Sequence, residues 1–219
     1  MARRFTREHL GLADLITESA VAVYMVVIIN GYVALTDIST SFYYIVALDI
    51  GASLAWGLID GFTSAIGTSA DRGRQATFVD KLRKEVKSDQ AITEVVEELD
   101  DTFLSRFSNE GKRNVATEVL KNSERASDAK PTFFNREDFD VLTAIVAVYL
   151  TAGIALSLPY VLLPNKVDAW ALSNIIGIAW LFYFGYSVGR ALGGKRILIG
   201  IITSSVGMAF LIISYSIYT

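Results

Sequence analysis

Two acidic residues inside a long apolar run constrain the fold of this chain more than any other feature. Asp49 and Asp60 are the only charged residues between Phe42 and Ile66. A carboxylate in a membrane-length segment is costly to insert unless it faces the interior of a helix bundle or a wet cavity. The two residues are eleven positions apart, so on a helix they share one face and lie about 16 Å apart along the axis. We interpret them as a functional acidic stripe; the alternative is that they only hydrogen-bond to neighbouring helices.

Small residues recur along the same run. Gly51, Gly57, Gly61 and Gly67 follow one another at short intervals, and small residues allow helices to approach closely in a membrane. We therefore expect this segment to pack tightly against other helices.

The composition is that of a membrane protein. The 219 residues are 52% hydrophobic and the mean hydropathy is +0.40, which is too apolar for an ordinary soluble domain of this length. There is no cysteine, and the single histidine, His9, lies in the N-terminal tail. Thiolate metal sites, cysteine nucleophiles and histidine-based triads are therefore excluded within one chain, and any metal must be held mainly by oxygen.

Five segments are long and apolar enough to cross a bilayer core, which takes about 20 residues. They are 14–36, the run that begins at Phe42, and the uncharged runs 141–164, 169–189 and 197–219. We predict an all-α polytopic membrane protein with five transmembrane helices and a three-helix cytosolic insert between helices two and three. The predicted parts are a cytosolic tail over 1–13, transmembrane helices one and two over 14–70, a helical cytosolic domain over 71–138, and transmembrane helices three to five over 139–219.

The insert is expected to be helical throughout. Residues 71–87 continue the second span without a helix breaker, and apolar residues at helical spacing predict further helices over about 90–107 and after Asn109. Four acids of the middle helix share one face, at i, i+3, i+4 and i+7: Glu94, Glu97, Glu98 and Asp101. Such a cluster suits a hard divalent cation, and it equally suits a solvated helix face.

Basic residues set the orientation. The tail holds three Lys and Arg, the insert thirteen and the turn after span four three, whereas the opposite side holds only Lys166. By the positive-inside rule the N-terminus and the insert are cytosolic and the C-terminus lies on the other side. The membrane would be the plasma membrane in a prokaryote and the vacuolar membrane in a eukaryote.

The acids of the first two spans can be compared by their expected depth in the membrane. Glu18 and Asp60 each fall about 9 Å inside the cytosolic boundary, so we expect them to share a site. Asp49 lies deeper and would be the next stop for a cation or a proton on a path outward. The spacing of Asp49 and Asp60 is too long for a proton-sharing protease dyad, and no acid lies in the uncharged runs of spans three to five. We therefore expect no enzyme.

The order of parts resembles that of the vacuolar iron transporter family. The resemblance covers most of the chain from about Asp14, and its most family-like pieces are the second span running into Thr68-Ser69-Ala70-Asp71 and the segment Ala155-Leu156-Ser157-Leu158-Pro159-Tyr160-Val161-Leu162-Leu163. It implies a homodimer that exports Fe²⁺, and sometimes Mn²⁺, from the cytosol in exchange for protons.

The resemblance also implies roles for particular residues. Glu18 matches the family's span-one acid, although Ser19 stands where the family has Gly. Asp60, followed by Gly61, falls near the family's Met-Gly of span two, and Asp49 falls near the acid upstream of it. A carboxylate in place of a thioether hardens the site and favours Mn²⁺ or Fe²⁺.

In the family the insert binds metal through Glu-x-x-Glu pairs and a Met-Met-x-x-Glu element. Glu94 and Glu97 match one pair, and Glu85 remains from the other, with Leu82 at the partner position. Phe133-Phe134-x-x-Glu137 has the spacing of the family's Met-Met-x-x-Glu element, with both Met ligands replaced. Phenylalanine cannot coordinate a metal. The insert is therefore either a weakened metal site or a helical cap that supports dimer packing.

These expectations converge on a divalent metal transporter. Fe²⁺ or Mn²⁺ would be the transported ion, with no organic cofactor, and the partners would be the lipid bilayer, a second copy, metal ions and protons, without nucleic acid. The transport path would run through Glu18, Asp60 and Asp49. The alternative is a non-transporting, membrane-anchored relative whose insert senses metal or binds a partner.

Overall fold

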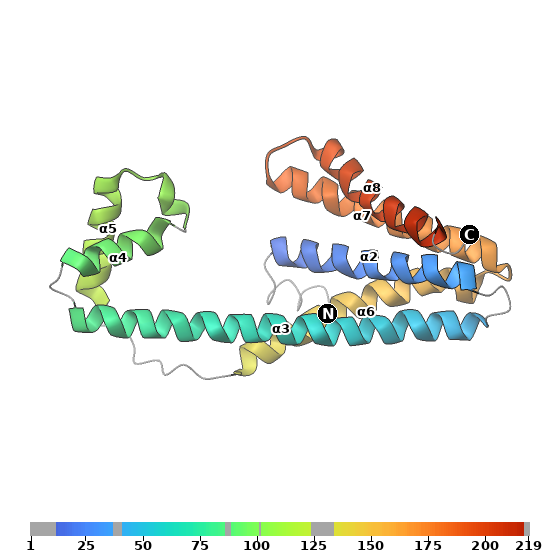
Figure 1. The fold of residues 1–219 in the computed structure, drawn as a ribbon, viewed down its shortest axis with the longest axis horizontal. Helices are drawn as coiled ribbons and strands as arrows, with labels where there is room; N and C mark the ends of the chain where they lie inside the picture. Colours follow the sequence, from blue (N-terminus) through green and yellow to red (C-terminus); the bar gives the residue numbers. More distant parts are fainter. Residues whose placement is uncertain (1–11, 37–40, 86–88, 101, 124–133, 217–219) are drawn as a thin grey trace. The chain divides into compact units, whose positions relative to one another are not determined.

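The structure is a computed structural model that describes residues 12–36, 41–85, 89–100, 102–123 and 134–216. Within these residues the chain is helical, as predicted, and no strand occurs. The helices, in the order seen in Figure 1, are α2 (Leu12–Thr36), α3 (Phe42–Glu85), α4 (Asp89–Asp100), the 3-10 turn η1 (Phe103–Arg106), α5 (Asn109–Ser123), α6 (Arg136–Leu162), α7 (Lys166–Ala191) and α8 (Arg196–Ser216).

Five of these helices are long and apolar enough to cross a membrane. Their candidate spans are Asp14–Tyr32, Phe42–Leu82, Arg136–Leu162, Lys166–Ala191 and Arg196–Ile213. The all-α class and the number of long apolar helices are thus confirmed, while the sidedness of the chain stays a prediction.

The chain divides into two compact units. One comprises Met1–Ala65 and Arg136–Thr219, and the other comprises Ile66–Asn135. The second unit covers most of the segment 71–138 that we expect to form a separate helical domain. Helix α3 contributes residues to both units.

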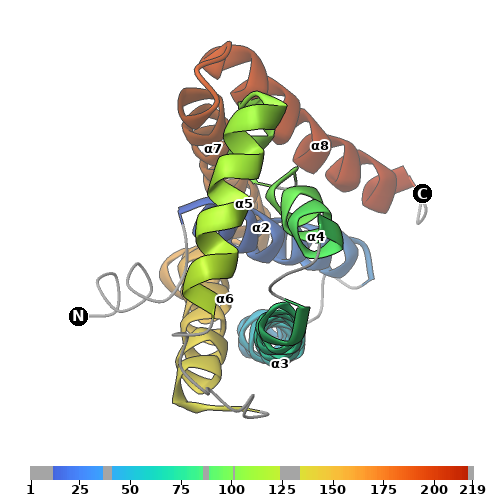
Figure 2. The same cartoon turned by 90° about the vertical axis from the view of Figure 1, so that its left-hand side faces the viewer.

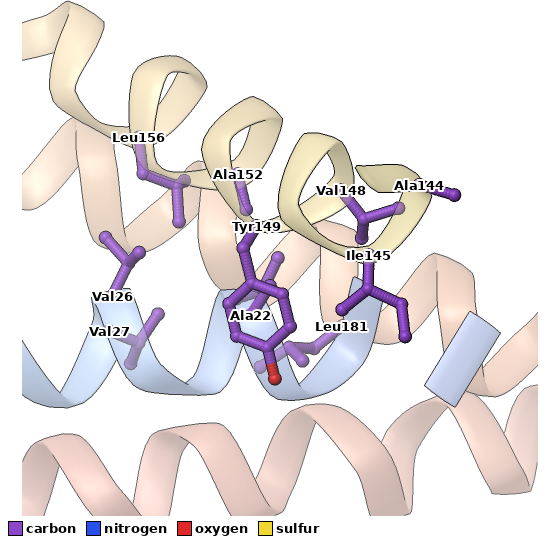
Figure 3. Packing of buried hydrophobic residues seen from close by; sticks show 11 residues of the cluster. Ala22, Val26, Val27, Ala144, Ile145, Val148, Tyr149, Ala152, Leu156 and Leu181 are labelled. Carbon is purple, nitrogen blue, oxygen red and sulfur yellow. The ribbon is translucent and has the colours of Figure 1, made fainter. Parts of the chain in front are cut away.

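The first unit is built around α2. Buried side chains of α2, α6 and α7 form its core, in which Tyr149 of α6 points toward α2 (Figure 3). Helices α7 and α8 lie side by side, as both Figure 1 and Figure 2 show. The aliphatic part of the core is supplied mainly by Val23, Val26, Val27, Ile145, Leu156 and Leu181.

Helices α3 and α6 approach closely at glycines. A β-carbon added to Gly57 would lie 3.0 Å from Cβ of Tyr149 and 3.1 Å from Cα of Val146, and one added to Gly61 would lie 3.0 Å from the carbonyl oxygen of Leu142. By contrast, a β-carbon added to Gly51 or Gly67 would meet no described atom within 4 Å. The expectation of tight packing therefore holds for Gly57 and Gly61 but not for Gly51 and Gly67.

The second unit has a small core of its own. Leu82 of α3 packs with Ala91 and Val95 of α4 and with Ala116 and Leu120 of α5. These side chains have the helical spacing that the apolar pattern of the insert predicts.

Three predicted helix boundaries are wrong. Helix α4 ends at Asp100 instead of about 107, because Thr102 accepts a hydrogen bond from the N–H of Leu104 and begins the separate turn η1. Helix α6 begins at Arg136, five residues before the predicted span, and ends at Leu162 instead of reaching 164. Pro159 lies within α6, and the N–H of Leu163 still donates to its carbonyl oxygen at 2.9 Å.

The close approach at Gly57 predicts an asymmetric response to bulk. Gly57→Leu is expected to lower the free energy of unfolding by about 1–3 kcal/mol, since the new side chain has to displace the α6 backbone. Thermal unfolding of the purified protein in detergent measures this. Gly51→Leu, on the same helix but facing open space, serves as the matched control and should not lower the midpoint; equal losses in both variants would contradict the packing.

Candidate functional site

The acids of the apolar helices lie at two polar positions in the first unit. One position surrounds Asp60 and the other surrounds Asp49. Both residues belong to α3. Both positions involve α6, because Tyr149 and Ser157 of α6 donate hydrogen bonds to Asp60 and Asp49.

Glu18, Asp60 and Tyr149 are brought together at the first position. The Tyr149 hydroxyl donates a short hydrogen bond to Oδ2 of Asp60. Glu18 of α2 lies close enough to interact electrostatically with both Asp60 and Tyr149. The structure thus brings within electrostatic reach of each other the two acids that the depth estimate assigns to one level, and it adds a buried hydroxyl from a third helix.

Asp49 occupies a drier environment. Its side chain is fully buried, and Ser157 of α6 donates from Oγ to its Oδ2 at 3.2 Å. Ser53, one turn further along α3, is also fully buried. Among the described residues, Oδ1 of Asp49 and Oγ of Ser53 have no hydrogen-bond partner. A buried carboxylate without a full set of partners is costly, so this position calls for an explanation beyond packing.

Asn30 connects three helices next to this second position. Its Nδ2 donates to Oγ of Ser173 at 2.9 Å, its Oδ1 accepts from the Tyr160 hydroxyl at 3.0 Å, and its backbone oxygen accepts from Nε1 of Trp170 at 3.0 Å. Tyr160 in turn lies within electrostatic reach of Asp49. The side chains of Asn30, Ser173 and Tyr160 are all buried, so α2, α6 and α7 are tied by a satisfied polar network.

The acidic face of α4 is partly neutralised by basic residues of α3. Glu94 pairs with Lys81 at 2.7 Å, and Glu98 pairs with Arg74 at 3.5 Å. Glu97 is exposed. Carboxylates held in ion pairs with lysine and arginine are poor candidates for metal ligands, and the described residues contain no group of three or more Asp, Glu or His that could hold a metal ion.

The other acids that we expect to bind metal are spread out. Asp101 and Phe133 lie outside the described residues, as does the side chain of Glu85. Glu137 is exposed at the start of α6, whereas its neighbour Asp138 is fully buried. The sequence analysis overlooked Asp138, because a residue at the edge of an apolar run carries no sign of which way it faces.

Sequence reasoning also missed Tyr149, Ser157, Ser53 and Asn30. Each lies in a run that is apolar throughout, and tyrosine, serine and asparagine are common packing residues between membrane helices. The available signal was the spacing of four residues between Asp49 and Ser53, and again between Gly153 and Ser157, which places each pair on one helix face.

The fold and these positions define a class of protein: a helical bundle suited to a membrane, with carboxylates and hydroxyls gathered in its interior. Comparison of the chain with protein-family models finds no match, and comparison with curated proteins finds none either. The arrangement of its own residues therefore has to carry the functional argument.

The bond between Tyr149 and Asp60 is open to a double-mutant cycle. Tyr149→Phe and Asp60→Ala are expected to be non-additive, with a coupling of about 0.5–3 kcal/mol in the free energy of unfolding, because either change alone removes the same hydrogen bond. Denaturant unfolding in detergent provides the measurement. As a control, Tyr149→Phe should add to Asp168→Asn, which alters an exposed acid in the first turn of α7. Additivity of the first pair would show that the hydroxyl and the carboxylate do not interact.

Proposed function

We propose that this protein is an integral membrane transporter of divalent metal, with Fe²⁺ or Mn²⁺ as its substrate, that moves metal out of the cytosol in exchange for protons. The observation that supports the proposal is that Glu18 and Asp60, from two different apolar helices, lie within electrostatic reach of each other, with the Tyr149 hydroxyl bonded to Asp60. Acids inside membrane helices are rare and mark ion pathways. The resemblance to the vacuolar iron transporter family points to the same function.

The chemistry of the two acids suits such a substrate. Two carboxylates balance the charge of one divalent cation, and hard oxygen ligands favour Mn²⁺ and Fe²⁺ over softer metals. Tyr149 would hold Asp60 in one orientation, which is the usual role of a group that hydrogen-bonds to a metal ligand. Since protons and metal compete for the same carboxylate oxygens, metal binding releases protons, and this competition would couple the two fluxes.

Asp49 would carry the path further from the cytosolic end. It lies on α3 three helical turns before Asp60, about 16 Å along the axis, and it is buried against α6. A second copy of the chain would complete the assembly, with the path close to the interface of the homodimer.

The second candidate function is a non-transporting relative that senses metal or binds a partner, and one observation favours its partner-binding form. The α4 acids Glu94 and Glu98 are engaged by Lys81 and Arg74, so the second unit has the ion-paired surface of a helical module. A partner-binding relative would move no metal across a membrane, and a sensing relative would bind Mn²⁺ in calorimetry without moving it.

Transport by reconstituted protein tests the first function. In proteoliposomes with an imposed pH gradient, wild-type protein should take up Mn²⁺ with counter-movement of protons, and Asp60→Asn or Glu18→Gln should slow uptake by about tenfold or more, the effect of losing about 1.4 kcal/mol of ion stabilisation. Asp168→Asn removes an exposed acid and should transport like wild type.

Full activity in Asp60→Asn, or the absence of any metal-dependent proton flux, would rule out the transporter. Mn²⁺ binding without flux would instead support the sensing relative.

The orientation can be tested because the chain contains no cysteine. Single cysteines at Asn114 of α5 and at Val167 of α7, both exposed, should react with a membrane-impermeant maleimide from opposite sides. The excess of Lys and Arg in the insert predicts that position 114 is labelled only from the cytosolic side. Labelling of both positions from one side would contradict the five-span topology.

A further inference from the structure

The surroundings of Asp49 contain a set of oxygen atoms that the acid pair at Glu18 and Asp60 does not use. Asp49 and Ser53 lie one turn apart on α3, and Gly153 and Ser157 lie one turn apart on α6. All four residues are buried. Ser157 bridges the two helices, since its Oγ is within hydrogen-bond distance of the Gly153 carbonyl oxygen (2.6 Å) and of Asp49 Oδ2 (3.2 Å).

Two of these oxygens lack partners. In the part of the chain that the structure describes, neither Oδ1 of Asp49 nor Oγ of Ser53 has a hydrogen-bond partner, and both side chains are 0% exposed. Buried polar atoms are nearly always paired, so each exception needs a reason. Two such atoms on adjacent turns of one helix face are accounted for by one ligand that needs both.

The charge that Asp49 carries when it is ionised indicates which ligand would fit. Among the described residues no Lys, Arg or His forms a salt bridge with Asp49. An ionised carboxylate in a membrane interior requires a positive partner. One carboxylate balances one positive charge, whereas a divalent ion would leave a net charge buried. A monovalent cation therefore fits this position.

The close packing of α3 and α6 limits the size of the cation. A β-carbon added to Gly153 would overlap Oγ of Ser53 and lie 2.8 Å from its Cβ and 3.2 Å from the carbonyl oxygen of Asp49, so the Ser53 hydroxyl lies against the α6 backbone. There is little room between the helices here, and the available ligands are hard oxygens: one carboxylate and two hydroxyls, with the Tyr160 hydroxyl within electrostatic reach. Hard oxygen donors suit alkali ions, and the narrow gap favours Na⁺ over the larger K⁺.

We infer that Asp49, Ser53 and Ser157 form a sodium-binding site between α3 and α6, separate from the pair of acids at Glu18 and Asp60. The inference concerns binding alone and stands whether or not the protein transports divalent metal. Each serine hydroxyl would contribute an oxygen lone pair, and the Asp49 carboxylate would neutralise the ion.

Equilibrium binding of radioactive Na⁺ to the purified full-length protein in detergent tests the site. Wild-type protein should bind saturably, and Li⁺ should displace the label better than K⁺. Asp49→Asn should weaken binding by about tenfold or more, and Ser53→Ala by a smaller factor, since one neutral ligand is lost instead of the charged one. Ser187→Ala, which removes an α7 hydroxyl that donates only within its own helix, should leave binding unchanged.

Two further measurements keep the inference open to refutation. If Asp49→Asn does not run as a monodisperse species in size-exclusion chromatography, Ser53→Ala and Ser157→Ala are compared with wild type instead. Na⁺ is then expected to raise the unfolding temperature of wild type more than that of either serine variant. Asp60→Asn should retain Na⁺ binding, which separates this site from the acid pair at Glu18 and Asp60. The inference would be overturned if wild-type protein showed no saturable Na⁺ binding, which is the result expected if Asp49 only holds a proton. It would also be overturned if both serine variants bound Na⁺ with wild-type affinity.

Discussion

At Gly57, Gly61 and Gly153 the backbones of α3 and α6 come so close that a methyl group could not be added without displacing a neighbour. This contact brings the Tyr149 hydroxyl onto Asp60 and the Ser157 hydroxyl onto Asp49. With bulkier residues the two helices would stand further apart, and both carboxylates would be left in an apolar interior without donors. The polar positions of the first unit therefore depend on close packing of two backbones, which is possible because glycine has no side chain.

The acids and the hydroxyls that meet them differ in how far the sequence reveals them. A charge in an apolar run is conspicuous, and helix geometry alone put Glu18 and Asp60 at one depth, where the structure has them within electrostatic reach. Tyr149 and Ser157 gave no such signal, because an uncharged polar residue in a membrane-length helix is ordinary. Their roles arise from the rotation of α6 about its axis, which is determined by packing between helices and not by local sequence.

In the second unit too, the sequence predicted the faces of single helices but not the contacts between helices. Helical spacing predicted the shared face of the α4 acids and the presence of helices with an apolar side in the insert. It did not reveal that Lys81 and Arg74 of α3 would face Glu94 and Glu98, since pairing between helices depends on how they are turned toward each other. The end of α4 was also misjudged, because the cap at Thr102 competes with continuation of the helix, and the apolar pattern runs on past it.

Asn30 ties α2 to α6 and α7 through two side-chain bonds and one backbone bond, none of which involves an ionisable carboxylate. Helix α3, in contrast, is joined to α6 by hydrogen bonds to the carboxylates of Asp60 and Asp49, which in the proposed transporter would change with ion binding and protonation. Three helices would thus form a stationary frame, and α3 would be the element that slides or rotates against it. Binding and release of ions would then move a single helix. Such a movement would expose the interior of the bundle to one side of the membrane at a time.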